Sequence, residues 1–167
     1  APVIPFAPDI IRRILSWGHI ATTSPRKIDT IIIHSSYDAL GKDSYSVDGV
    51  IKEYKIYKVS PHFLISKTGT TYQLAQENDI AYHAGVSKMP DGRVNVNNFS
   101  IGIELIYKDN GEPGPAQYDS LAKLTAYLQK KYGISKNNIF GHSDISPERK
   151  TDPWNFNWDI FYESLAK

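Results

Sequence analysis

Thr30-Ile31-Ile32-Ile33-His34 is a run of β-branched residues that ends on an imidazole. β-Branched side chains favour strands, and an uninterrupted apolar run is typical of a strand buried inside a sheet. Two further apolar runs are similar: residues 98–106 contain one carboxylate, Glu104, and residues 139–140 lead into His142. These runs predict buried strands whose ends present polar side chains.

Apolar residues at regular spacing divide the rest of the chain into short elements. A spacing of three to four residues predicts helices, and two apolar runs around a Gly-containing turn predict a hairpin. Gly133 follows the longest predicted helix, as the residue that ends a helix often does. The predicted helices span residues 9–17, 47–57, 115–132 and 157–165, and the predicted hairpin strands span residues 62–66 and 71–74. No repeat or low-complexity segment interrupts the pattern, so we expect one domain.

Length and composition limit the possible functions. At 167 residues the chain fits one domain that can bury a core without disulfides, and it contains no cysteine. The formal net charge of +1 and the lack of a basic run argue against nucleic-acid binding. No apolar stretch approaches the roughly 20 residues needed to span a bilayer, so we expect no transmembrane segment. Because the chain begins at Ala1 rather than Met, we expect a removed leader or a trimmed chain.

Two imidazoles and one carboxylate form a candidate metal site. His34 follows the first apolar run, and one short loop contains His142, Lys150 and Asp152. Three N/O ligands with one open position are typical of catalytic zinc, whereas structural zinc usually has a fourth protein ligand, most often cysteine. We therefore predict one zinc ion per chain, bound by His34, His142 and Asp152.

The chemistry expected at such a site is hydrolysis of an amide or an ester. Zinc lowers the pKa of its bound water to about 7, which allows attack on a carbonyl carbon near neutral pH. The reaction also needs a group that moves protons and a positive charge near the carbonyl oxygen. Glu104 is costly to bury in an apolar strand unless it has a partner or a task. Lys150 lies two residues before Asp152, so in an extended segment both side chains point to one side.

At these residues the chain resembles the zinc-dependent N-acetylmuramoyl-L-alanine amidases. This superfamily includes AmpD-type enzymes, phage lysozyme-type amidases and animal peptidoglycan-recognition proteins. The similarity runs from about residue 30 to the C-terminus, in the ordered blocks 31–34, 59–65, 82–85, 98–105 and 141–153. Glu104 fits the AmpD-like branch, in which an acid at this position has the catalytic role.

The resemblance implies a fold, a reaction and a set of site residues. The fold would be a single α/β domain, with a central mixed sheet flanked by helices and zinc at the strand ends in a surface groove. Zinc would be bound by the three ligands named above, Glu104 would handle protons, and Lys150 would stabilise the tetrahedral intermediate. The substrate would be peptidoglycan or a muropeptide, cleaved between the lactyl group of N-acetylmuramic acid and L-alanine. The candidate substrate contacts are His62, His83, Ser35, Asn97 and Arg93.

The match leaves residues 1–28 as an N-terminal extension with a short helix and residues 29–167 as the amidase domain. Some positions inside the match depart from the family pattern. Tyr82 replaces a tryptophan, and Ser35 and Asn95 stand where an asparagine and an arginine that contact ligand are expected. Together with the processed-looking start, these departures lead us to expect an extracytoplasmic monomer, with cytoplasmic muropeptide recycling as the alternative.

The sequence also leaves other interpretations open. The alternative function is a non-catalytic peptidoglycan-binding module of the same fold, although such modules typically lack a zinc ligand. A zinc peptidase of another origin lacks support because no His-Glu-x-x-His motif occurs. His62 and His83 could instead bond backbone carbonyls, and we expect Asp144 to cap the turn that follows it.

Overall fold

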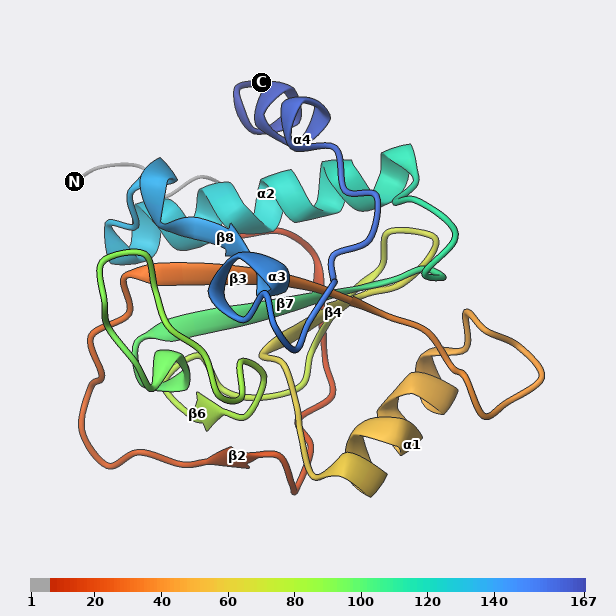
Figure 1. Ribbon diagram of the computed structural model, residues 1–167, viewed down its shortest axis with the longest axis horizontal. Coiled ribbons are helices and arrows are strands. Elements are labelled where there is room, and N and C mark those ends of the chain that lie inside the picture. Colours follow the sequence, from red (N-terminus) through yellow and green to blue (C-terminus); the bar gives the residue numbers. More distant parts are fainter. Residues whose placement is uncertain (1–6) are drawn as a thin grey trace.

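The computed structural model describes residues 7–167, so the first six residues of the predicted extension lie outside it. The described chain forms one α/β domain around a mixed sheet (Figure 1). The sheet has six strands, in the order β1 (Ile10–Arg12), β5 (Thr71–Gln73), β4 (Phe63–Ile65), β7 (Ser100–Ile106), β3 (Thr30–Ser36) and β8 (Ile139–Gly141). Only the β4–β5 hairpin is antiparallel within this sheet. A separate antiparallel pair joins β2 (His19–Ile20) to β6 (Ile80–Ala81).

Helices lie on both sides of the sheet, as the α/β prediction requires (Figure 1). The helices are α1 (Val47–Tyr57), α2 (Pro115–Tyr132), α3 (His142–Ile145) and α4 (Trp158–Leu165), with 3-10 turns η1 (Val96–Asn98) and η2 (Lys136–Asn138). Helix α1 begins where the Ser46 hydroxyl accepts a hydrogen bond from the amide of Gly49. Helix α2 ends at Gly133 in the left-handed conformation, as predicted.

Side-chain alternation gives the sheet two different faces. On β7, Ile101 and Ile103 join the main core, which α2 covers through residues such as Leu124. Gly102 and Glu104 point to the opposite face, because successive residues of a strand alternate in direction. Figure 1 shows α2 and α4 stacked on one side of the sheet and α1 on the other side.

The face opposite α2 is not uniformly apolar. Leu64 and Ile106 pack there against α1 in one cluster. Ile32 packs against Val96 in a separate cluster under the loops that precede β7. His34 lies between these two apolar regions, so the fold leaves a polar strip in the middle of a sheet face.

The helix predicted over residues 9–17 is wrong. Residues 10–12 form β1, which pairs in parallel with β5, and the pairing continues as the amides of Arg13 and Leu15 donate to backbone carbonyls. A helix of this length is marginal without tertiary contacts, whereas pairing with β5 satisfies the same backbone groups. The two adjacent isoleucines alternate, and Ile11 is 52% exposed, as expected for an edge strand.

Other predicted elements are confirmed with small shifts at their ends. Strand β3 continues two residues beyond His34, and the predicted strand over residues 98–106 begins at Ser100 after the turn η1. The final helix begins after Asn157, whose side chain accepts two backbone amide hydrogen bonds. Within residues 7–167, no helix is both long enough and apolar enough to cross a membrane.

Candidate metal centre and catalytic groove

Three separate elements bring the predicted metal ligands together. His34 lies on β3, His142 begins α3 directly after β8, and Asp152 lies in the loop that follows α3. One ligand atom from each residue lies within 4.8 Å of the others, and all three residues are buried. The amide of Ser143 donates to the carbonyl oxygen of Asp152, which fixes the loop beside the helix. The structure therefore brings the three predicted ligands together.

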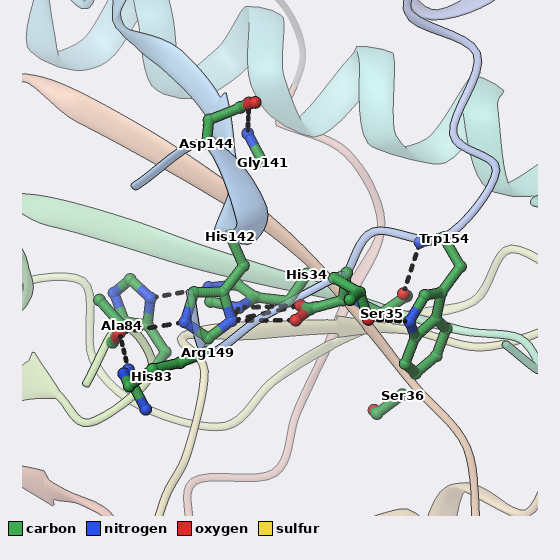
Figure 2. A network of polar contacts seen from close by, with 12 residues as sticks. His34, Ser35, Ser36, His83, Ala84, Gly141, His142, Asp144, Arg149 and Trp154 are labelled. Atoms are coloured by element: carbon green, nitrogen blue, oxygen red, sulfur yellow. Dashed lines mark hydrogen bonds and ion pairs between the residues drawn. The ribbon is translucent and has the colours of Figure 1, made fainter. Parts of the chain in front are cut away.

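The distances show which ligand atoms face one another. The Nδ1 atoms of His34 and His142 are 3.0 Å apart. The Asp152 carboxylate lies 3.2 Å from the Nδ1 atom of His142 and 3.5 Å from that of His34. Both imidazoles thus present Nδ1 to one point, as Figure 2 shows from close by.

The hydrogen bonding of His142 indicates that this point suits a cation. The Nε2 atom of His142 lies 3.0 Å from the carbonyl oxygen of Ala84, which can only accept, so Nε2 is the protonated nitrogen. With the hydrogen on Nε2, the lone pair of Nδ1 of His142 points at a carboxylate and at a second imidazole. Such converging lone pairs repel one another unless a cation lies between them, and this donor set is typical of zinc. The residues present therefore fit the predicted metal.

The surroundings also keep these ligands in the forms that bind metal. Burial, together with the neighbouring His142, lowers the pKa of His34 from 6.5 to about 4, so the imidazole is neutral. Although burial alone would raise the pKa of Asp152, its close contacts with the imidazoles of His142 and His34 lower it below its ordinary value. Asp152 is therefore a carboxylate, as a metal ligand must be.

Glu104 lies beside the metal ligands on the same face of the sheet. It is 8% exposed, and its backbone is the register partner of His34 across β3 and β7. Burial, with a smaller effect of the Asp152 charge, raises the pKa of Glu104 to about 8. A carboxyl with such a pKa can both accept and donate a proton near neutral pH.

A groove of about 560 Å³ opens above these residues. Its walls include the three metal ligands, Glu104 and Lys150, so all five predicted metal and catalytic residues line one cavity. A larger hollow of about 660 Å³ lies between α2 and α4, but none of the predicted site residues line it. The groove on the opposite face is therefore the candidate active site.

Two of the predicted substrate contacts line this groove, namely Ser35 and His83. The amide of Ser35 donates to Asp152 at 3.4 Å, and its hydroxyl accepts a hydrogen bond from the amide of Trp154 at 3.3 Å. Ser35 therefore fixes the loop that contains Asp152. The ring of His83 contacts the ring of His34 through one nitrogen of each.

His62, Asn97 and Arg93 do not line the groove. His62 is fully buried, with Nδ1 accepting from the amide of Gly102 and Nε2 lying 3.0 Å from a carbonyl oxygen. Both ring nitrogens are therefore used inside the protein. The Asn97 side-chain oxygen accepts hydrogen bonds from two backbone amides. The Arg93 guanidinium forms ion pairs with Asp29 and Asp91 at 3.0 and 2.9 Å.

Asp144 does not belong to the metal cluster. The prediction that it caps the turn that follows it is wrong, because its side chain bonds to a residue that precedes it. Its carboxylate accepts a hydrogen bond from the amide of Gly141, three residues earlier, at 2.7 Å. It therefore caps the start of α3, where negatively charged groups interact favourably with free amides. Figure 2 shows this side chain turned away from His142.

The groove walls contain residues that the sequence analysis did not select. They include two aromatic side chains and one arginine, namely Tyr37, Trp154 and Arg149. Arg149 donates to the carbonyl oxygen of Val86 at 2.9 Å, so it fixes a wall loop. No spacing pattern marks these residues, because they lie in loops.

Known proteins resemble this chain in both sequence and fold. A family model described as "N-acetylmuramoyl-L-alanine amidase" matches residues 24–155, which include the metal cluster, Glu104 and Lys150. The 1,6-anhydro-N-acetylmuramyl-L-alanine amidase AmpD of Haemophilus influenzae is 38% identical over an alignment of 159 positions, which covers 85% of this chain and 85% of that protein.

Solved structures agree with this similarity. A crystal structure of a selenomethionine derivative of AmpD superposes with a TM-score of 0.79 at 30% identity and covers 95% of each chain. AmiD from E. coli, in complex with the substrate anhydro-N-acetylmuramic acid-L-Ala-D-γ-Glu-L-Lys, has a TM-score of 0.72 at 25% identity, over 88% of this chain and 65% of its own. With its sequence, its fold and its buried His-His-Asp cluster in agreement, this chain belongs to the N-acetylmuramoyl-L-alanine amidase family.

Proposed function

We propose that this amidase uses one zinc ion, bound by His34, His142 and Asp152, to cleave the amide bond between the lactyl group of N-acetylmuramic acid and L-alanine. The observation that supports this most strongly is the buried cluster of two imidazoles and a carboxylate in a groove that also contains Glu104 and Lys150. A zinc ion at this site would supply Lewis-acid activation of water near neutral pH.

The remaining chemistry belongs to side chains of the groove. Glu104 accepts a proton from the attacking water and returns a proton to the leaving amine, and its raised pKa suits both steps. Lys150 provides a positive charge where negative charge develops on the carbonyl oxygen. The positive charge of Lys150 offsets part of the increase in the pKa of Glu104. This interaction is consistent with both groups acting on one substrate.

We further propose that the substrate is a muropeptide with a 1,6-anhydro sugar. This rests on the similarity to an AmpD named for that sugar and to AmiD bound to an anhydro-muropeptide. It favours the alternative location, cytoplasmic muropeptide recycling, over the extracytoplasmic location expected from the sequence. The enzyme is proposed to act as a monomer, because one chain supplies the three metal-ligating residues, Glu104 and Lys150.

The competing hypothesis is a non-catalytic peptidoglycan-binding module. It is disfavoured because the chain retains three metal-ligating residues, Glu104 and Lys150 around one groove. A site that only binds its ligand does not need a buried acid with a pKa near neutral pH.

One experiment separates these proposals. The zinc-loaded protein and the Asp152→Ala variant are incubated with soluble anhydro-muropeptide and with intact sacculi, and released stem peptide is measured. The proposed function predicts release from the soluble substrate by the wild-type protein only. Binding without release would support the non-catalytic module, and faster release from sacculi would overturn the anhydro-muropeptide proposal.

A further inference from the structure

The second ring nitrogen of His34 has a partner that the proposed reaction does not use. The Nε2 atom of His34 lies 2.9 Å from the Nδ1 atom of His83. The other ring nitrogen of His83 lies 3.1 Å from the hydroxyl of Ser100. That hydroxyl donates to the carbonyl oxygen of Val96 at 2.7 Å. These contacts form a chain from the backbone of η1 to the metal site.

The direction of every hydrogen bond in this chain follows from its last member. A carbonyl oxygen only accepts, so the single hydrogen of Ser100 is used on Val96. Ser100 must therefore accept from Nε2 of His83, and a neutral His83 then has a bare Nδ1. This bare nitrogen accepts from Nε2 of His34, which leaves Nδ1 of His34 free to bind metal.

His83 is held in place by a close-packed neighbour. Its ring lies against Gly102, where an added Cβ would lie 2.4 Å from the ring carbon Cγ. Only glycine leaves room for the ring at this position of β7.

The residue after His83 supports the second imidazole. The carbonyl oxygen of Ala84 accepts from Nε2 of His142 at 3.0 Å. The side-chain oxygen of Asn97 in turn accepts from the amides of His83 and Ala84 at 3.2 and 2.9 Å. Figure 2 shows His83 and Ala84 beside the two imidazoles. Two consecutive residues therefore contact the two histidine ligands, His83 through its side chain and Ala84 through its carbonyl oxygen.

We propose that His83 is a positioning residue and not a substrate contact. Ser100 holds His83, and His83 in turn fixes which ring nitrogen of His34 carries the hydrogen and how that ring is oriented. The inference rests on the metal site proposed above. Metal-ligating histidines usually donate their other N–H to a carboxylate, a carbonyl or water, and this partner fixes the ring orientation and makes the ligand more basic. Here a second imidazole has that role, and both of its nitrogens are used.

Zinc affinity tests the proposal directly. Competition with a chromophoric chelator gives the zinc dissociation constant of the full chain and its variants. His83→Ala removes the acceptor and should weaken zinc binding by about 10- to 100-fold, the usual effect of losing such a partner. His83→Asn places an amide oxygen near the former Nδ1 position, so its affinity should stay close to wild type. Wild-type affinity in His83→Ala would overturn the proposal.

A matched control removes a histidine that does not touch the ligands. The ring of His19 contacts the carbonyl oxygen of Leu15 and the carboxylate of Asp79. His19→Gln should therefore leave zinc affinity unchanged. If His19→Gln weakened zinc binding as much as His83→Ala, the effect would come from general loosening of the fold and the proposal would fail.

The protonated nitrogens are visible in NMR spectra of the isotopically labelled protein. Wild-type His83 should carry its hydrogen on Nε2, and Ser100→Ala should change this signal without removing the ring. A hydrogen on Nδ1 of His83 would overturn the proposal. If the wild-type chain bound no zinc, the proposed metal site would fail, while the same spectra would still decide the role of His83.

Discussion

His34 and Glu104 are register partners on the adjacent parallel strands β3 and β7. Because paired residues of a sheet point to the same face, a metal ligand and an acid lie side by side in the polar strip between two apolar clusters. The acid is therefore next to the metal site and faces away from the main core.

Replacing Glu104 should separate catalysis from metal binding. Glu104→Gln keeps the shape of the side chain but cannot take up a proton, so the rate should fall by about 10² to 10⁴. Zinc content should stay near one per chain, as measured by metal analysis. The acidic limb of the rate profile should also disappear. Near wild-type turnover would mean that another group is the general base, and the fully bonded His62 is a poor candidate.

The same substitution should change how stability depends on pH after chelation of the metal. Folded Glu104 holds its proton up to about pH 8, whereas the unfolded chain loses it near pH 4.5. The folded state therefore binds more protons in this window, and its stability falls as pH rises. The buried histidines, with pKa values lowered from 6.5, oppose this trend only below about pH 6.5.

Urea unfolding between pH 6.5 and 8 should therefore show a falling free energy of unfolding for the wild-type protein and a flatter dependence for Glu104→Gln. Parallel curves for the two proteins would contradict the raised pKa of this carboxyl.

Lys150→Ala should slow the reaction at every pH. The lost positive charge acts mainly in the transition state, so the rate should fall by about 10² to 10³ with little change in substrate affinity. Kinetics across the pH range check this, with zinc content as the control. A loss of affinity with unchanged turnover would make Lys150 a binding residue instead.

Removal of the metal should abolish turnover and leave most of the fold intact. The core of this domain is formed by the sheet and α2 and does not include the ligands. Chelation should therefore remove activity while the far-ultraviolet circular dichroism spectrum stays similar. Asp152→Ala should lose both zinc and turnover, because two imidazoles alone bind zinc weakly. Stoichiometric zinc in this variant would point to another ligand.

The N-terminal segment over residues 10–15 should contribute to the stability of the fold. Leu15 is 7% exposed and packs in the cluster on the α1 side, so Leu15→Ala should lower the free energy of unfolding by about 2 to 5 kcal/mol. Ile11 is 52% exposed, and Ile11→Ala serves as the control with a much smaller effect. Equal effects of the two variants, measured by urea unfolding, would contradict this packing.

The sequence by itself determined most elements and the three residues of the candidate metal cluster. The β-branched run before His34, the spacing of α1 and α2 and the glycine after α2 depend on local preferences, which a pattern of residues reports directly. The metal cluster was predictable because two histidines and an aspartate follow or interrupt apolar runs, where such groups need a function or a partner. The N-terminal segment was mispredicted because its strand exists only through pairing with β5, and nothing local indicates that pairing.

The tertiary structure alone decided which groups face the groove and which atoms they present. His62, Asn97 and Arg93 look like surface-contact residues in the sequence, yet their polar atoms are used by partners inside the protein. The protonated nitrogen of His34 depends on His83 and Ser100, which lie 49 residues from His34 and 17 residues from His83, respectively. Hydrogen-bond direction is set by the acceptor at the end of such a chain, and only folding brings that acceptor next to its donors.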